Sequence, residues 1–394
     1  MSASVRVVGV GMIPFAKPGA SEPYQVMAAA AVRAALADAG LDYGDVEQAY
    51  AGYVYGDSTC GQRALYEVGM TGIPVFNVNN NCSTGSTALF LARQAIAGGS
   101  VECALAVGFE QMEAGAFGTK FKDRPSPFDR FDEETAALVG MPDVPLALRY
   151  FGGAGIEHMK RYGTRVETFA RIRAKASRHA ANNPLALFRK EVSVDDVMAS
   201  PMMIPGVMTR LMACPPTCGA AAAILVSEGF ARRHGMRAPV RIAAQAMTTD
   251  SPSTFEAHDM MRLVGYDMAQ SAADKVYEAA GIGPDEVDVV ELHDCFAHNE
   301  LVSYEALRLC PEGGAEKFVV DGDNTYGGKV VTNPSGGLLS KGHPLGATGL
   351  AQCFELTQQL RGNAGARQVA GARIALQHNL GLGGAAVVTL YRAD

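Results

Sequence analysis

Two segments far apart in the chain resemble each other, and this internal repeat constrains the fold more than any other feature. Residues 37–47 (ADAGLDYGDVE) and 278–288 (EAAGIGPDEVD) each follow an alanine-rich stretch typical of an amphipathic helix. Each precedes a short apolar run typical of a strand. Gly40 and Gly281 stand where helix C-caps are expected. The repeat predicts two similar α/β halves, each a sheet covered by helices.

A second pair of segments follows the first in the same order. Residues 82–89 (CSTGSTAL) match residues 343–350 (HPLGATGL), and both open a helix of small residues. If a pseudo-two-fold axis relates the two halves, it also relates these two helix starts. The repeat therefore predicts that Cys82 and His343 lie close together.

Cys82 stands between an apolar, strand-like run at 75–78 and the predicted helix. The unpaired N–H groups and the dipole at a helix start are expected to lower the pKa of a thiol placed there. The same amides can receive an oxyanion, so the position suits a nucleophile. The alternative, which the residue alone leaves open, is a small buried hydrophobic side chain.

Composition excludes several classes of protein. The chain has 394 residues, 48% of them hydrophobic, with a net charge of −7, which argues against a nucleic-acid binder. No apolar stretch approaches the ~20 residues of a membrane span, and neither a signal peptide nor a peroxisomal C-terminal signal is recognisable. Eight scattered cysteines show no disulfide-scaffold spacing. A cytoplasmic protein with no membrane insertion is predicted.

The middle of the chain differs in amino-acid composition from both repeats. We predict three parts: residues 1–116 with 206–236 as the N-terminal half, 117–205 as an inserted loop domain, and 237–394 as the C-terminal half. Residues 158–190 are helix-like and basic, with Arg171, Arg173 and Lys175 among many cations. They form either a solvated face or a cradle for a phosphorylated ligand.

Three further motifs lie at the ends of apolar runs, where α/β folds place their ligands. They cover residues 291–300, 333–346 and 377–384. Together with Cys82 they supply two thiols and two imidazoles, which suit acyl transfer: a nucleophile, a base, an acid and an oxyanion donor. A metal site is the rival, but Cys214-x3-Cys218 and His293-x-Cys295 lack a second pair at zinc spacing. No metal is predicted.

The motifs together resemble the thiolase superfamily, in particular the sterol carrier protein 2 group that includes the thiolase domain of sterol carrier protein x. The resemblance implies a five-layer αβαβα thiolase fold with two duplicated halves and an inserted loop domain. It also implies a homodimer, coenzyme A thioesters as substrates and no permanently bound cofactor. The segments that carry the resemblance are NNNCSTGSTAL (79–89), HDCF (293–296), DNTYGGK (323–329), GHP (342–344) and QHNLG (377–381).

The resemblance also implies roles for individual residues. Cys82 is the acylated nucleophile, His343 activates it, His293 binds the thioester oxyanion and Cys295 is the acid/base. The N–H groups of Cys82 and Gly381 form a second oxyanion site. The CoA phosphates are expected on Arg171, Arg173 and Lys175. Where common thiolases carry Cys-x-Gly, this chain has Asn379-Leu380-Gly381, a replacement that is itself a feature of the group.

The predicted function is a 3-ketoacyl-CoA thiolase of fatty-acid, branched-chain or sterol side-chain degradation. Two alternatives stay open: a retro-aldol lyase or condensing enzyme acting on acyl-CoA, and a non-catalytic acyl-CoA-binding subunit. Because the sequence ends without a lipid-transfer domain, we expect a bacterial stand-alone enzyme, with a separate lipid-transfer protein or partner subunit as an open question.

Overall fold

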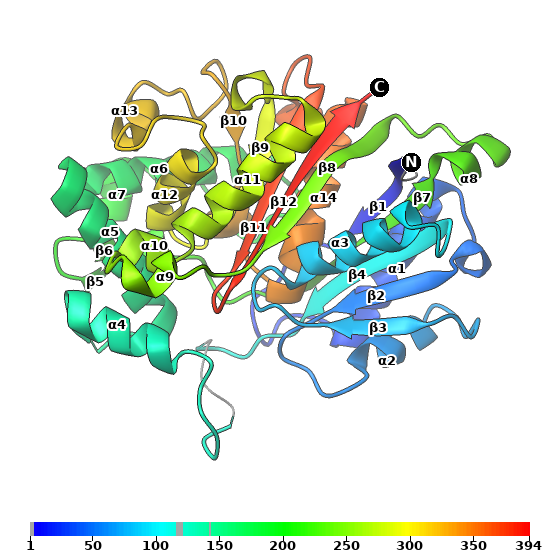
Figure 1. Ribbon diagram of the computed structural model, residues 1–394, viewed down its shortest axis with the longest axis horizontal. Helices are drawn as coiled ribbons and strands as arrows, with labels where there is room; N and C mark the ends of the chain where they lie inside the picture. Colours follow the sequence, from blue (N-terminus) through cyan, green and yellow to red (C-terminus); the bar gives the residue numbers. More distant parts are fainter. Residues whose placement is uncertain (1–3, 116–120, 142) are drawn as a thin grey trace.

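The computed structural model describes residues 4–115, 121–141 and 143–394, and these residues form a ten-stranded sheet covered by helices (Figure 1). The strands in spatial order are β10 (Val331–Thr332), β9 (Val289–Glu291), β11 (Ile374–Gly381), β12 (Ala385–Ala393), β8 (Val240–Thr248), β1 (Val5–Met12), β7 (Gly219–Ser227), β4 (Cys103–Glu110), β2 (Gln48–Gly52) and β3 (Val75–Val78).

The sheet consists of two equivalent halves. The order β1-β7-β4-β2-β3 in one half matches β8-β12-β11-β9-β10 in the other, with two antiparallel pairings followed by two parallel ones in each. The halves join where β1 pairs with β8 over two residue pairs. The two halves predicted from the repeat are confirmed.

Helices complete five layers, as the family resemblance implied. α1 (Tyr24–Ala39) covers the outer face of the first half and α11 (Tyr266–Ala280) that of the second. α3 (Thr84–Ala97) and α14 (Leu345–Arg361) pack against each other between the halves. The predicted C-caps Gly40 and Gly281 are confirmed, since both adopt the left-handed conformation, with φ of 65° and 63°.

The segment between β4 and β7 packs on the second half, mainly against α10 (Met260–Leu263) and α12 (Ala297–Ala306). The predicted boundary between residues 116 and 117 lies outside the described residues, and the domain limits stay a prediction. The inserted segment holds α4 (Asp129–Val139), α5 (Leu146–Tyr162), α6 (Val166–Ala181), α7 (Val194–Met198), β5 (Met202–Ile204) and β6 (Met208–Thr209). The other α-helices of the described residues are α2 (Cys60–Tyr66), α8 (Glu228–Arg233), α9 (Ser253–Glu256) and α13 (Ala315–Val320).

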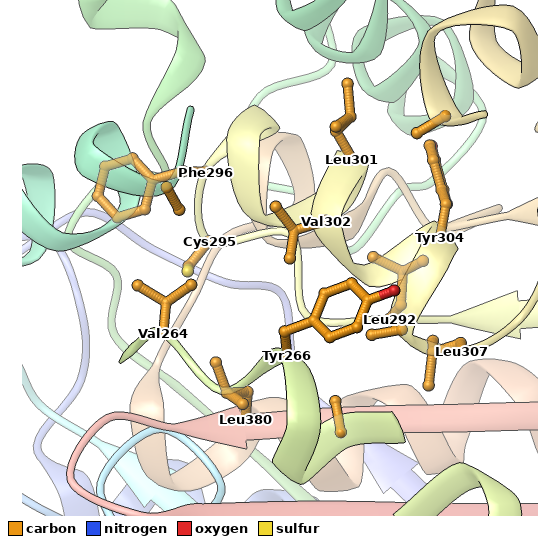
Figure 2. Packing of buried hydrophobic residues seen from close by; sticks show 14 of the residues in the cluster. Val264, Tyr266, Leu292, Cys295, Phe296, Leu301, Val302, Tyr304, Leu307 and Leu380 are labelled. Carbon is orange, nitrogen blue, oxygen red and sulfur yellow. The ribbon is translucent and has the colours of Figure 1, made fainter. Parts of the chain in front are cut away.

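The largest hydrophobic cluster joins this inserted segment to the second half. Figure 2 shows Tyr266 of α11 among Val302 and Leu307, with Cys295 at one side of the cluster. The thiol of Cys295 is thus backed by a close-packed core. Among the described residues, no helix combines the length and the apolar character that crossing a membrane requires.

Glycines let the two halves approach each other backbone to backbone. A Cβ at Gly108 of β4 would lie 2.0 Å from the carbonyl oxygen of Gly346 in α14. A Cβ at Gly85 of α3 would lie 2.6 Å from that same oxygen. Real Cβ atoms do not come so close to backbone, so these positions require glycine. The first turn of α14 is thereby held directly against β4 and α3.

We expect Gly108→Ala to destabilise the protein by at least the ~1–3 kcal/mol typical of overpacking, because only backbone movement can relieve the clash. Thermal unfolding of purified protein measures the effect. Gly44→Ala is the matched control, since a Cβ there meets nothing within 4 Å. Equal unfolding midpoints for the two variants would contradict the close contact.

Candidate active site

A tight turn presents Cys82 at the start of α3. Asn81 adopts a left-handed conformation, with φ of 51°. The Thr84 hydroxyl accepts a hydrogen bond from the Asn80 amide at 2.8 Å and donates one to the Asn81 carbonyl at 2.6 Å. These local side-chain to backbone bonds fix the turn. The thiol therefore precedes the first turn of α3 and is only 5% exposed.

Two imidazoles meet this thiol. One side-chain atom each from Cys82, His293 and His343 lies within 4.8 Å of the other two, and all three residues are buried. The imidazole rings are edge to face, with centroids 5.1 Å apart. The predicted proximity of Cys82 and His343 is confirmed. One thiol and two imidazoles also form a set that zinc accepts, so a metal-free site stays a prediction.

Hydrogen bonds fix the ring of His343. Its Nδ1 lies 2.7 Å from the Thr348 hydroxyl, which donates to the Pro344 carbonyl at 3.0 Å. With that donation made, the hydroxyl oxygen is an acceptor and His343 Nδ1 carries the proton. Among the described residues, Nε2 of His343 has no hydrogen-bond partner. Its lone pair can therefore take a proton from a neighbouring thiol.

The thiols of Cys82 and Cys295 and the ring of His343 line one pocket of about 240 Å³. The other walls are mainly apolar and include Met112, Leu148, Phe151, Phe296 and Leu345. A larger cleft of about 490 Å³, which shares Leu382 with the pocket, contains Tyr55, Arg124 and Phe128. An apolar pocket beside a wider cleft suits a ligand with a reactive end and a long remainder.

Burial keeps the site neutral. Burial and the nearby Glu110 carboxylate raise the pKa of Cys82 to about 12, and burial raises the pKa of Cys295. Burial lowers the pKa of His343 to about 3 and that of His293 well below its usual value. The prediction that the helix start lowers the pKa of Cys82 is wrong, because desolvation and Glu110 outweigh the dipole of one helix end.

Glu110 is a buried carboxylate that the sequence analysis missed. It accepts hydrogen bonds from the amides of Val54, Tyr55 and Gly346 at 3.1, 2.8 and 3.0 Å. Three amides at a helix start and a loop compensate a buried negative charge. The available signal was a single acid at the end of an otherwise uncharged strand, residues 103–110. Glu110 ties the first turn of α14 to the end of β4.

Two buried acidic side chains also hold the loop that leads to His343. Asp294 accepts hydrogen bonds from the amides of Leu338 and Leu339 at 2.7 and 3.3 Å. Burial and Glu300 raise the pKa of Asp294 to about 8. Glu291 accepts from the amide and hydroxyl of Ser335 at 3.0 and 2.8 Å. Neither residue was assigned a role from the sequence, although both lie within the motif at residues 291–300.

Arg173 and Lys175 also make buried polar contacts with the second half. Arg173 is 3% exposed and donates to the Ser340 hydroxyl at 2.7 Å. Lys175 is 2% exposed and forms an ion pair with Glu300. The prediction that these two cations bind CoA phosphates is wrong, because α6 packs them against the second half. Arg171 is exposed on α6, and its contact with a phosphate stays a prediction.

β11 extends further than the sequence suggested. The segment 377–381 was expected to follow a strand, but the strand runs to Gly381. A Cβ at Gly381 would lie 2.2 Å from the Asn80 carbonyl oxygen, so the strand end lies against the turn that carries Cys82. In the same strand, Asn379 Nδ2 lies 3.0 Å from His293 Nδ1. From the sequence, Asn379 was notable only because it stands where Cys-x-Gly motifs have their cysteine.

Comparison with known proteins agrees with this geometry. The family description "Thiolase, N-terminal domain" matches residues 5–196, and "Thiolase C-terminal domain-like" matches residues 249–391. The chain is 58% identical to sterol carrier protein 2 of Rattus norvegicus over 392 residues, covering 98% of this chain and 72% of the relative.

Solved structures share the fold at low sequence identity. An "Ltp2-ChsH2(DUF35) aldolase" superposes with a TM-score of 0.84 at 21% identity, covering 100% of this chain and 98% of that one. Human mitochondrial 3-ketoacyl-CoA thiolase superposes with a TM-score of 0.74 at 18% identity, covering 100% and 99%. At these identities the likeness concerns the fold.

The raised pKa of Cys82 predicts how the thiol reacts. Because only the thiolate is alkylated, its rate with iodoacetamide should rise about tenfold per pH unit and show no plateau below about pH 10. Peptide mass spectrometry after short exposures measures the rate at this residue, with Cys82→Ala as the control for peptide assignment. A plateau near pH 7–8 would instead indicate a resting thiolate paired with an imidazolium.

Proposed function

The chain belongs to the thiolase family, and we propose that it is a 3-ketoacyl-CoA thiolase that cleaves 3-oxoacyl-CoA with CoA through an acyl intermediate on Cys82. The observation that carries the proposal is the meeting of Cys82, His293 and His343 within 4.8 Å, with Cys295 in the same pocket. Fatty-acid, branched-chain and sterol side-chain degradation are the pathways that we propose for this reaction.

In the first step His343 Nε2 takes the proton of Cys82 as the sulfur attacks the 3-carbonyl carbon. The N–H groups of Cys82 and Gly381 receive the charge on the 3-carbonyl oxygen. The bond between carbons 2 and 3 then breaks, which leaves an acyl thioester on Cys82 and an enolate of the shortened CoA thioester. Because the resting pKa values oppose charge separation, proton transfer and attack are coupled.

In the second step the enolate is quenched. His293 donates a hydrogen bond to the enolate oxygen, and Cys295 gives its proton to carbon 2, so that acetyl-CoA or propanoyl-CoA leaves. The thiol of a second CoA then attacks the acyl group on Cys82; its proton restores the thiol of Cys295, and the proton held by His343 returns to the departing sulfur of Cys82. Coenzyme A is a substrate here, and we propose the cleft of about 490 Å³ containing Arg124 as its path.

The test combines turnover with detection of the intermediate. Wild-type protein should cleave acetoacetyl-CoA or longer 3-ketoacyl-CoAs with CoA and show an acyl adduct on Cys82 by mass spectrometry; Cys82→Ala should show neither. Cys295→Ala should still exchange labelled CoA into an acyl-CoA but lose ~10²–10⁴-fold in cleavage, because only cleavage needs the proton on carbon 2.

Two outcomes would contradict the thiolase proposal. Carbon–carbon cleavage of a 3-hydroxyacyl-CoA without a Cys82 adduct would indicate a retro-aldol lyase. Binding of acyl-CoA with no turnover of any 3-ketoacyl-CoA would indicate a non-catalytic subunit.

We further propose a homodimer formed through β3. This strand ends the sheet, its free edge is unpaired among the described residues, and Phe76 at its centre is 46% exposed. An open, partly apolar edge readily pairs with a second strand. The opposite edge, β10, has two residues and both are buried, which makes it the weaker candidate.

Phe76→Lys should convert the dimer to monomers, because a charge on the edge strand disfavours pairing. Light scattering after gel filtration measures the mass. Met141→Lys is the control for a charge added elsewhere on the surface, since Met141 is exposed. A Phe76→Lys protein that stays dimeric would move the interface to another face.

A further inference from the structure

His293 has two ring nitrogens, and one of them lies beside a side-chain amide of β11. Its Nδ1 lies 3.0 Å from Asn379 Nδ2, and both residues are at most 1% exposed. Because burial keeps the imidazole neutral at physiological pH, it carries a single N–H. Which nitrogen holds that proton decides whether the other nitrogen, Nε2, is a hydrogen-bond donor or an acceptor.

A chain of buried hydrogen bonds determines which nitrogen carries the proton. The chain starts at a backbone carbonyl, whose role as an acceptor is certain. The carbonyl oxygen of Gly349 can only accept, and Gln377 Nε2 lies 2.6 Å from it, which fixes the orientation of the Gln377 amide. Gln377 Nε2 also donates to Ser86 Oγ at 2.7 Å. The Ser86 hydroxyl is then left to donate to Asn379 Oδ1 at 2.9 Å.

The orientation of Asn379 follows from this chain. With its oxygen turned to Ser86, its Nδ2 faces His293 and donates, so Nδ1 of the imidazole must hold a lone pair. We propose that Asn379 is a positioning residue that fixes His293 as the Nε2–H tautomer, so that the ring presents a hydrogen-bond donor to the thioester oxygen. The role at the oxygen rests on the proposed function, whereas the tautomer does not.

The tautomer can be measured on the resting protein without turnover. Long-range ¹⁵N–¹H NMR of the full chain labelled at histidine distinguishes protonated from unprotonated ring nitrogens, and His293→Gln assigns the signals. The expected spectrum shows a proton on Nε2 and none on Nδ1. A proton on Nδ1 would overturn the proposal, whatever the enzymatic activity is.

Substitutions at Asn379 separate positioning from packing. Asn379→Asp keeps the shape but turns the donor into an acceptor, which favours a proton on Nδ1. Loss of the Nε2–H tautomer of His293 should lower kcat/KM for CoA-dependent cleavage by ~10²–10⁴-fold near pH 8. Asn379→Leu only removes the preference and should lose about tenfold. A packing role predicts the reverse ranking, because aspartate is the closer isostere.

The pH profile supplies a second signature. Near pH 6 the new carboxylate should promote the imidazolium, which carries N–H on both nitrogens, so Asn379→Asp should recover activity relative to wild type. Ser86→Ala should resemble Asn379→Leu, because it frees the amide to flip. Asn183→Asp is a buried control whose amide donates to the Ser335 carbonyl and not to a histidine, and it should keep the wild-type profile shape.

The outcomes distinguish the two proposals. Wild-type protein without cleavage or adduct contradicts the thiolase function, and the NMR result still decides the tautomer. An active wild type in which Asn379→Asp is milder than Asn379→Leu, with an unshifted pH profile, overturns the positioning role alone.

Discussion

The contact between the first turns of α3 and α14 is the constraint on which the site depends. Cys82 and His343 each stand just before one of these helices, so the distance between nucleophile and base is set by how closely the helix starts approach. Gly85 and Gly346 remove the Cβ atoms that would hold them apart. Since proton transfer requires near-contact, a displacement of about 1 Å here can cost ~10²-fold in rate.

This contact also buries the site, and burial determines its electrostatics. The thiols and imidazoles are neutral at rest because neither charged form is solvated. Two buried acids near the site receive hydrogen bonds from backbone amides. Glu110 and Asp294 each accept amide hydrogen bonds and fasten the segments that carry the reactive groups. The reactive groups are thus neutral, while hydrogen-bonded acids around them hold the segments in place.

The sequence could predict what the repeat encodes and could not predict what packing decides. The pairing of Cys82 with His343 follows from symmetry, because equivalent segments of two halves meet at the axis. The pKa of Cys82 does not follow, since it depends on burial and on a carboxylate from another strand. Arg173 and Lys175 appear in a basic run, but only tertiary packing shows that their helix turns them inward.

Because of the same symmetry, equivalent positions of β4 and β11 can be compared, and they carry residues with different roles. Gly108 of β4 and Asn379 of β11 are equivalent: each pairs with the third residue of the neighbouring antiparallel strand, Ala221 or Val387. In the first half the glycine leaves room for α14. In the second half the equivalent position bears a side chain that reaches α3 through Ser86 and orients His293.

At a neighbouring pair of equivalent positions the large side chain is in the first half and the glycine is in the second. Glu110 ends β4 and Gly381 ends β11, and their registers make them equivalent. The carboxylate secures α14 to the first half, whereas the glycine lets the end of β11 touch the turn before Cys82. A bulky residue at 381 would push that turn away, and a glycine at 110 would leave three amides unpaired. The asymmetric site therefore arises from side chains chosen differently at equivalent points of a symmetric frame.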